Sequence, residues 1–320
     1  MRLEDIGFYT LSDERARNAS ISSPLWRCEL ILTDECNQRC PYCRGLRPDI
    51  AGVMSFRDAA SILHLWSADG LRNIRFSGGE PTLWPGLCEL TQLAIRGGVK
   101  RVAVSTNGTA QELDYYDRLV DAGVNDFSVS LDAGCCSIGD SMAGVNGAWD
   151  KAVSTIRHLS KMVYVTVGMV FTNRNIEQAK EAVMFADSLG VSDIRVIPSA
   201  QYNRALILLA DLPESILAKY PILRYRIGNV QAGRHVRGIQ QCDSHQCRLV
   251  LDDMAIAGNY HFPCIIYMRE GGDPVGKVGA NMRSEREAWM LTHDTHNDDI
   301  CRKNCLDVCI DYNNKAGIEK

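Results

Sequence analysis

The stretch Cys36-Asn-Gln-Arg-Cys40-Pro-Tyr-Cys43 places three cysteines at a C-x3-C-x2-C spacing, directly after an apolar run at 28–33. A loop this tight can bring three thiolates to one metal centre. A cubane iron–sulfur cluster normally takes four cysteines, so a loop with three leaves one iron open to an outside ligand. A structural zinc site is the alternative, but it needs a fourth ligand, and this stretch has no second C-x2-C pair.

Strand and helix patterns alternate on either side of this loop. Strand-like runs end near 33 and lie at 73–77, 100–105, 127–131, 163–167 and 193–197, and helical patterns lie at about 55–67, 86–96, 111–122, 147–161 and 175–189. Six strand–helix units predict a parallel sheet with helices outside. Six units are too few for a closed eight-fold barrel, so we expect a curved, open (β/α)6 partial barrel of the TIM type.

Polar and glycine-rich residues follow the expected strands at their carboxyl ends, where ligands gather in such folds. These residues are Cys36–Cys43, Gly78-Gly79-Glu80, Thr106-Asn107-Gly108, Ser130 with Asp132, and Pro198-Ser199. Gly-Gly and Asn-Gly are also ordinary turn signals. Five such groups at one rim of one sheet are hard to attribute to turns alone.

The cysteine loop, together with Ser-Gly-Gly-Glu-Pro at 77–81, resembles the signature of the radical S-adenosylmethionine (radical SAM) family over about residues 25–200. The resemblance implies that Cys36, Cys40 and Cys43 hold a [4Fe–4S] cluster whose open iron binds SAM. It implies that Gly78, Gly79 and Glu80 hold the SAM amino group and that Tyr42 lies near the adenine. It also makes Asn107, Ser130 and Ser199 candidate SAM contacts, and Asp132 a candidate catalytic residue.

A second cysteine group lies in the last quarter of the chain. Cys247 and Cys264 flank two strand-like runs joined by Gly-Asn, so a hairpin is expected to bring the two thiols together. Cys301, Cys305 and Cys309 are spaced at i, i+4 and i+8, which places them along one face of a helix.

This second group resembles the twitch domain, a shortened SPASM domain that binds one auxiliary [4Fe–4S] cluster. The resemblance assigns Cys247, Cys264, Cys301 and Cys305 as its ligands, with Cys309 as a replacement for Cys305 or Cys301. A structural zinc site is the competing interpretation.

Some thiols are left over after these assignments. Cys242, Cys309 and Cys136, with its neighbour Cys135, are candidate hydrogen-atom donors, the role that thiols have in radical epimerases. Burial or chance is the simpler explanation for each of them.

Composition bounds the remaining expectations. The 320 residues carry a formal net charge of −4, which gives no electrostatic case for nucleic acid. No apolar run reaches membrane-spanning length and the start lacks a signal-peptide profile, so a cytoplasmic protein is expected. Thirteen cysteines in such a chain indicate metal or cluster binding instead of disulfides.

The expected organisation has four parts. Residues 1–25 form a lead-in across the main domain, 26–200 the barrel, 201–241 a linker, and 242–320 a small C-terminal domain made of a hairpin and a helix. For the linker we expect a helix with a solvated basic face, and a clamp for a substrate carboxylate or phosphate is the weaker alternative. The basic face contains Arg224, Arg226, Arg234 and Arg237.

The resemblance implies a radical SAM enzyme, an oxidoreductase or epimerase. Such an enzyme cleaves SAM to a 5′-deoxyadenosyl radical with an electron from a donor such as flavodoxin or ferredoxin. We expect the radical to take hydrogen from a C–H bond of a small polar substrate (an aminocyclitol, sugar or nucleoside), giving dehydrogenation or epimerisation. About 35 residues precede the cluster loop, fewer than a leader-peptide-binding domain needs.

Two alternatives remain open. One is a peptide- or protein-modifying maturase, and the other is a non-enzymatic zinc-binding module. GTP cyclisation of the molybdopterin type is disfavoured, because the sequence ends Ala-Gly-Ile-Glu-Lys and not with that family's Gly-Gly tail.

Overall fold

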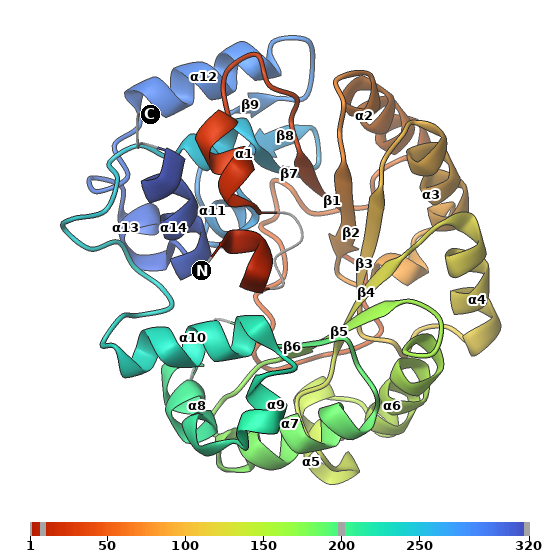
Figure 1. The fold of residues 1–320 in the computed structure, drawn as a ribbon. Helices are drawn as coiled ribbons and strands as arrows, with labels where there is room; N and C mark the ends of the chain where they lie inside the picture. Colours follow the sequence, from red (N-terminus) through yellow and green to blue (C-terminus); the bar gives the residue numbers. More distant parts are fainter. Residues whose placement is uncertain (1, 7–10, 198–201, 317–320) are drawn as a thin grey trace.

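The computed structural model describes residues 2–6, 11–197 and 202–316, and its centre is a curved sheet of parallel strands (Figure 1). Each strand pairs in parallel with the next along the chain, as the alternation predicts. The expected (β/α)6 partial barrel is therefore confirmed. Its strands are β1 (Arg27–Thr33), β2 (Asn73–Gly78), β3 (Arg101–Thr106), β4 (Asp126–Ser130), β5 (Tyr164–Met169) and β6 (Asp193–Val196).

Helices cover the outer face of this sheet (Figure 1). Ser55 caps the first of them as expected, because its hydroxyl accepts a hydrogen bond from the amide of Asp58. The helices are α2 (Phe56–Ala68), α3 (Leu87–Arg96), α4 (Leu113–Ala122), α5 (Cys136–Ala143), α6 (Ala148–Leu159) and α7 (Ala179–Ser188). None of the helices in the described residues is long and apolar enough to cross a membrane.

Alternating side chains divide β1 between two environments. Leu30 and Leu32 are fully buried in the apolar core between the sheet and the helices. Arg27 and Glu29 point to the opposite face, where they line a cavity inside the barrel. The barrel interior is therefore charged, whereas the layer outside the sheet is apolar.

The C-terminal hairpin is present, but it does not form a separate sheet. Its strands β7 (Asp253–Ala257) and β8 (Tyr260–Phe262) pair antiparallel around the predicted Gly-Asn turn, where Gly258 has φ +56. β7 also pairs in parallel with β1, with Arg27 opposite Asp253. Including β9 (Gly276–Lys277), the described residues form one sheet in the order β6-β5-β4-β3-β2-β1-β7-β8-β9.

The expected linker with a solvated basic face is wrong in part. Three helices lie within residues 202–231: α8 (Tyr202–Leu208), α9 (Glu214–Leu217) and α10 (Pro221–Gln231). Their apolar residues join the main core. Arg226 is only 3% exposed and donates to the carbonyl of Val196 at 2.7 Å. Arg234 and Arg237 likewise form ion pairs, with Asp311 and Glu270.

The last cysteines do not share one helix. Helix α13 (Asp299–Asn304) ends before Cys305, which has an extended ψ of 134, and α14 (Asp307–Ala316) then begins. The break replaces the single helical face that the i, i+4, i+8 spacing predicts. The remaining helices are α1 (Asp13–Asn18), α11 (Ile265–Arg269) and α12 (Met282–Thr292).

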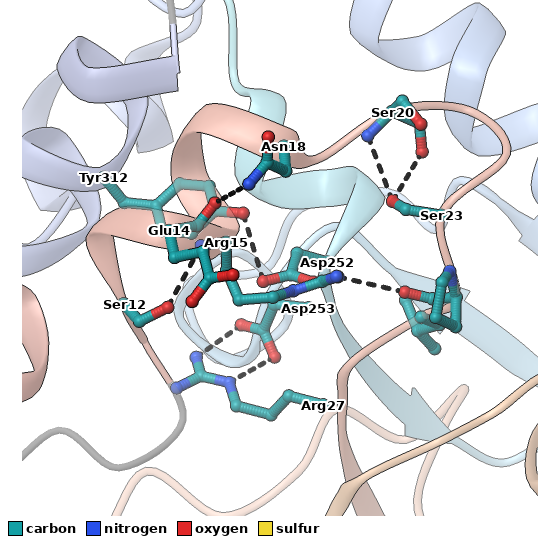
Figure 2. A network of polar contacts seen from close by, with 12 residues as sticks. Ser12, Glu14, Arg15, Asn18, Ser20, Ser23, Arg27, Asp252, Asp253 and Tyr312 are labelled. Atoms are coloured by element: carbon teal, nitrogen blue, oxygen red, sulfur yellow. Dashed lines mark hydrogen bonds and ion pairs between the residues drawn. The ribbon is translucent and has the colours of Figure 1, made fainter.

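The N-terminal helix α1 fastens the C-terminal region to the barrel (Figure 2). Arg15 forms an ion pair with Asp252, which is 1% exposed, and its guanidinium also lies 4.3 Å from the Trp26 ring centroid. The second oxygen of Asp252 accepts a hydrogen bond from Tyr312 in α14 at 3.0 Å. One buried carboxylate thus joins the two ends of the described chain.

We expect Asp252→Ala to lower the free energy of unfolding by about 3–5 kcal/mol, because it leaves a buried guanidinium and a buried phenol without their acceptor. The measurement is urea unfolding followed by circular dichroism. Asp211→Ala is the matched control, since its ion pair with Lys180 is exposed and such pairs contribute no more than about 1 kcal/mol. Equal shifts in the two variants would contradict the role of this network.

Candidate active site

The three cysteines of the first group lie in a loop at the carboxyl end of β1. Cys36 and Cys43 are exposed and Cys40 is half-buried. The amide of Arg39 donates to the carbonyl of Ala143 at 3.0 Å, so the end of α5 supports the loop. A Cβ at Gly144 would lie 2.5 Å from the carbonyl oxygen of Arg39, which leaves room only for glycine there.

The spacing of the sulfurs bears on the choice between a zinc ion and an iron–sulfur cluster in this loop. In the described residues no three cysteine sulfurs lie within 4.8 Å of one another. A tetrahedral zinc ion with Zn–S bonds of about 2.3 Å holds its sulfurs about 3.8 Å apart. The three sulfurs of the loop are therefore not arranged as zinc would hold them, and three thiols, two of them on exposed residues, suit a larger iron–sulfur cluster.

The two glycines after β2 permit a close approach of two backbone segments. A Cβ on Gly78 would lie 2.2 Å from the carbonyl oxygen of Thr33, and one on Gly79 would lie 2.3 Å from that of Glu35. The amide of Gly79 donates to Thr33 at 2.7 Å. In this structure the glycines make room for the backbone at the start of the cysteine loop. The resemblance implies a contact with the SAM amino group instead.

Glu80 binds protein groups through both of its carboxylate oxygens. It is 1% exposed and accepts hydrogen bonds from the amide and hydroxyl of Thr82, the hydroxyl of Thr106 and the amide of Asn107. Burial raises its pKa, and these donors oppose that shift. Sequence reasoning assigned Glu80 to the SAM amino group, whereas here it ties the end of β2 to the end of β3.

Asn107 connects this network to the cysteine loop. Its side-chain amide donates to Asn37 at 2.7 Å and to the sulfur of Cys36 at 3.7 Å. A hydrogen bond to a ligand sulfur is one of the features that set the potential of an iron–sulfur cluster. Ser130 is exposed at the end of β4, and Ser199 lies outside the described residues.

Tyr42 and Asp132 bind each other across the rim. The phenol of Tyr42 donates to Asp132 at 2.5 Å, and the amide of Val170 donates to the other carboxylate oxygen at 2.7 Å. Burial raises the pKa of Asp132 to about 6. The pair joins the cysteine loop to the ends of β4 and β5, so the structure supplies a positioning role for a residue expected to be catalytic.

Arg269 brings the C-terminal region to the same rim, which sequence reasoning missed. It is the last residue of helix α11 and donates to the carbonyls of Gly45 at 2.8 Å and Gly78 at 3.2 Å. Burial lowers its pKa, and the negative charges of Glu29 and Cys43 oppose that shift. Nothing in the local sequence indicates these contacts, because the partners lie 224 and 191 residues away.

The second cysteine group gathers around one apolar cavity of about 610 Å³, which we call the cysteine cavity. Five cysteines line it, two from the hairpin and three from the α13–α14 region: Cys247, Cys264, Cys301, Cys305 and Cys309. Burial raises the pKa of Cys264 to about 12. Metal binding would replace those thiol protons.

His293 lies beside Cys301, one of the cysteines that line this cavity. Its ring stacks on Trp289 with centroids 3.9 Å apart, and its Nε2 lies 3.6 Å from the sulfur of Cys301. Three possible ligand atoms lie within 4.8 Å of one another here, one each from His293, Asp298 and Cys301. The His-Asp-Thr-His run contains no periodicity that would reveal this packing.

The spare thiols do not share one environment. Cys136 and Cys242 are exposed. Cys309 lines the cysteine cavity and also a second cavity, of about 770 Å³, which lies inside the barrel and which we call the lumen cavity. Among the candidate hydrogen-atom donors, the structure brings only Cys309 to both cavities.

Comparison with known proteins supports the same assignment. Residues 30–186 match the radical SAM superfamily. The chain is 28% identical to a probable GTP 3′,8-cyclase of Metallosphaera sedula, over 54% of this chain and 56% of that protein. It is 29% identical to an AdoMet-dependent heme synthase of Methanosarcina barkeri, over 50% and 46%. The chain thus spans about half the length of the curated relatives it matches.

Solved structures with a similar fold cover more of the chain. One is anSMEcpe with bound AdoMet, with a TM-score of 0.63, 16% identity, and coverage of 87% of this chain and 82% of that one. Another is SuiB of Streptococcus suis bound to the precursor peptide SuiA, with a TM-score of 0.61, 16% identity, and coverage of 84% and 65%. At such identities the likeness concerns the fold alone. The match over residues 30–186 places that part of the chain in the radical SAM superfamily.

Proposed function

We propose that the protein is a radical SAM enzyme that acts on a C–H bond of a small polar molecule, by dehydrogenation or epimerisation. The observation that supports this most is the position of the cysteine loop, at the rim of a barrel whose interior holds a charged cavity.

Cys36, Cys40 and Cys43 would hold the first [4Fe–4S] cluster, with SAM at its open iron. When bound, this pair supplies the carbon radical that removes hydrogen from the substrate. Around it, Glu80 fixes the end of β2 against β3, and Asn107 donates a hydrogen bond to the sulfur of Cys36.

Two further sets of hydrogen bonds position the loops at the rim. Asp132 accepts a hydrogen bond from Tyr42, and Arg269 donates to the carbonyls of Gly45 and Gly78. A small redox protein, such as a flavodoxin or ferredoxin, would supply the electron.

The cysteine cavity would hold an auxiliary [4Fe–4S] cluster bound by four of its five cysteines. Support comes from the number of thiols, from the apolar walls, and from the sulfurs, no three of which lie within 4.8 Å of one another in the described residues. This arrangement corresponds to the twitch-type domain that the sequence resembles.

Four cysteines would bind the cluster, so one of the five in the cysteine cavity stays free. The identity of this free cysteine decides between epimerisation and dehydrogenation. A thiol beside the substrate can return a hydrogen atom to the opposite face of a radical, which gives epimerisation. If Cys309 is the unligated cysteine, it faces the lumen cavity and suits that role. If Cys309 ligates the cluster, dehydrogenation is favoured, with the cluster as electron acceptor.

A peptide-modifying function is the second candidate. SuiB, which has a similar fold, was solved with a precursor peptide bound, and a likeness in fold allows such a substrate here. The GTP 3′,8-cyclase relatives add a nucleotide as a third substrate class to test.

We expect the reconstituted protein to contain about eight irons per chain and to release 5′-deoxyadenosine from SAM under reducing conditions. Cys40→Ala should lose about four irons and all SAM cleavage, because the remaining two thiols cannot hold the cubane. Iron analysis, electron paramagnetic resonance and product chromatography measure these effects.

Cys88→Ala is the matched control, because Cys88 lies in α3 outside both cysteine groups. It should keep its iron and its cleavage rate. Stoichiometric zinc without iron in the wild-type protein would instead favour the zinc-binding module.

A series of five cysteine-to-alanine variants tests the auxiliary cluster. Four of the variants at 247, 264, 301, 305 and 309 should lose about four irons while the spectrum of the first cluster with SAM persists. The fifth should retain about eight. Retention of all iron in every variant would contradict a cluster in the cysteine cavity.

A further inference from the structure

Three side chains of different chemistry converge beside the cysteine cavity: His293, Asp298 and Cys301. The Nε2 of His293 lies 3.6 Å from the sulfur of Cys301 and 3.7 Å from Oδ2 of Asp298. In the part of the chain that the structure describes, no other three ligand atoms of histidine, cysteine, aspartate or glutamate come within 4.8 Å of one another. The histidine and the aspartate are too far apart to share a hydrogen bond. An ion placed between the three atoms would contact them all.

The observed distances are close to those that a tetrahedral zinc ion imposes on its ligands. Bonds of about 2.3 Å to sulfur and about 2.0–2.1 Å to nitrogen or oxygen hold sulfur and nitrogen about 3.6 Å apart, and nitrogen and oxygen about 3.4 Å apart. The structure has 3.6 Å and 3.7 Å for these two pairs. A set of thiolate, imidazole and carboxylate also suits zinc, whereas magnesium and calcium prefer oxygen ligands alone.

Contacts outside the group hold each of the three side chains in place. The His293 ring stacks on Trp289 with centroids 3.9 Å apart. The phenol of Tyr267 donates to Oδ2 of Asp298 at 3.0 Å, the oxygen that faces His293. The other oxygen of Asp298 accepts from the amide of Cys301 at 2.7 Å. Outer contacts of this kind orient the ligands of metal sites, so the geometry is arranged before an ion binds.

The charges of the three groups also suit a divalent cation. The side chains of His293 and Asp298 are only 17% and 18% exposed. Burial lowers the pKa of His293, which keeps its ring neutral and able to coordinate. One carboxylate and one thiolate then carry two negative charges, and a zinc ion balances both of them.

We propose that His293, Asp298 and Cys301 bind one zinc ion, separate from the two proposed clusters. The ion would join the end of α12, at His293, to the start of α13. It would thereby fix the segment that carries Cys305 and Cys309 to the cysteine cavity. Water would fill the fourth position, as it does in zinc sites with three protein ligands.

The zinc site also identifies the cysteine that the auxiliary cluster leaves free, and this step alone rests on the proposed function. With Cys301 bound to zinc, the cluster keeps the other four cysteines of the cavity: Cys247, Cys264, Cys305 and Cys309. Cys309 is then a cluster ligand and not a hydrogen-atom donor. Dehydrogenation is therefore the favoured outcome of the reaction.

The test is the metal content of the full chain, reconstituted with iron and sulfide, mixed with a stoichiometric amount of zinc sulfate and desalted. We expect about one zinc beside about eight irons per chain. X-ray absorption at the zinc edge should show one sulfur neighbour at about 2.3 Å, with nitrogen and oxygen neighbours at about 2.0–2.2 Å.

His293→Ala and Asp298→Asn should each weaken zinc binding at least about tenfold and keep about eight irons, since even an outer contact to a ligand contributes that much. Asp298→Asn retains an oxygen for the amide of Cys301, so the start of α13 is preserved. Cys301→Ala should lose the zinc and also keep about eight irons. His64→Ala is the matched control, because His64 is exposed on α2, and it should bind zinc as the wild type does. Circular dichroism checks that each variant folds.

The inference is overturned if no zinc remains after desalting, or if the zinc has two or more sulfur neighbours. Wild-type zinc binding in any of the three variants, or loss of about four irons in Cys301→Ala, contradicts it as well. The proposed function is judged separately, by SAM cleavage in the wild type. Cleavage without zinc binding removes this inference alone, and zinc binding without cleavage removes the proposed function alone.

Discussion

The parallel pairing of β7 with β1 is the constraint on which the rest of the structure depends. Without it, β1 would be the exposed edge of the six-stranded barrel sheet. The pairing satisfies that edge and places Asp253 against Arg27 in a two-point ion pair. It also carries Cys264 of the hairpin to the barrel interior and positions α11, whose last residue Arg269 reaches the rim. One strand pairing thus joins both cysteine groups to a single scaffold.

Burial of charge explains how the rim of this barrel is organised. A buried charge is tolerated when it is paired or hydrogen-bonded, and the two buried carboxylates of the rim meet that condition. Glu80 has four donors and Asp132 has two. These hydrogen bonds tie the end of β2 to that of β3, and the cysteine loop to the residue after β5.

The barrel could be predicted from sequence because its signals are local. The strand and helix periods, the Ser55 cap and the polar residues at strand ends all lie within a few residues of one another. The β7–β1 pairing and the contacts of Arg269 join residues about 190–230 apart, and no local pattern encodes them. Glu29 was visible as a lone charge in the apolar run Cys28-Glu-Leu-Ile-Leu. That signal could have been used, since a charge within a buried strand must face a polar interior.

The two cysteine groups lie at opposite ends of β1, and this separation limits how they can cooperate. The first group follows Thr33, whereas Cys264 and Cys309 line the cavity that begins at Arg27. Six residue steps of strand amount to about 20 Å, so no side chain bridges them directly. Helix α11 lies between the two groups. It begins directly after Cys264, which lines the lumen cavity, and its last residue Arg269 donates to the carbonyls of Gly45 and Gly78 at the rim. This short helix is therefore the direct protein connection between the second cysteine group and the rim that supports the first.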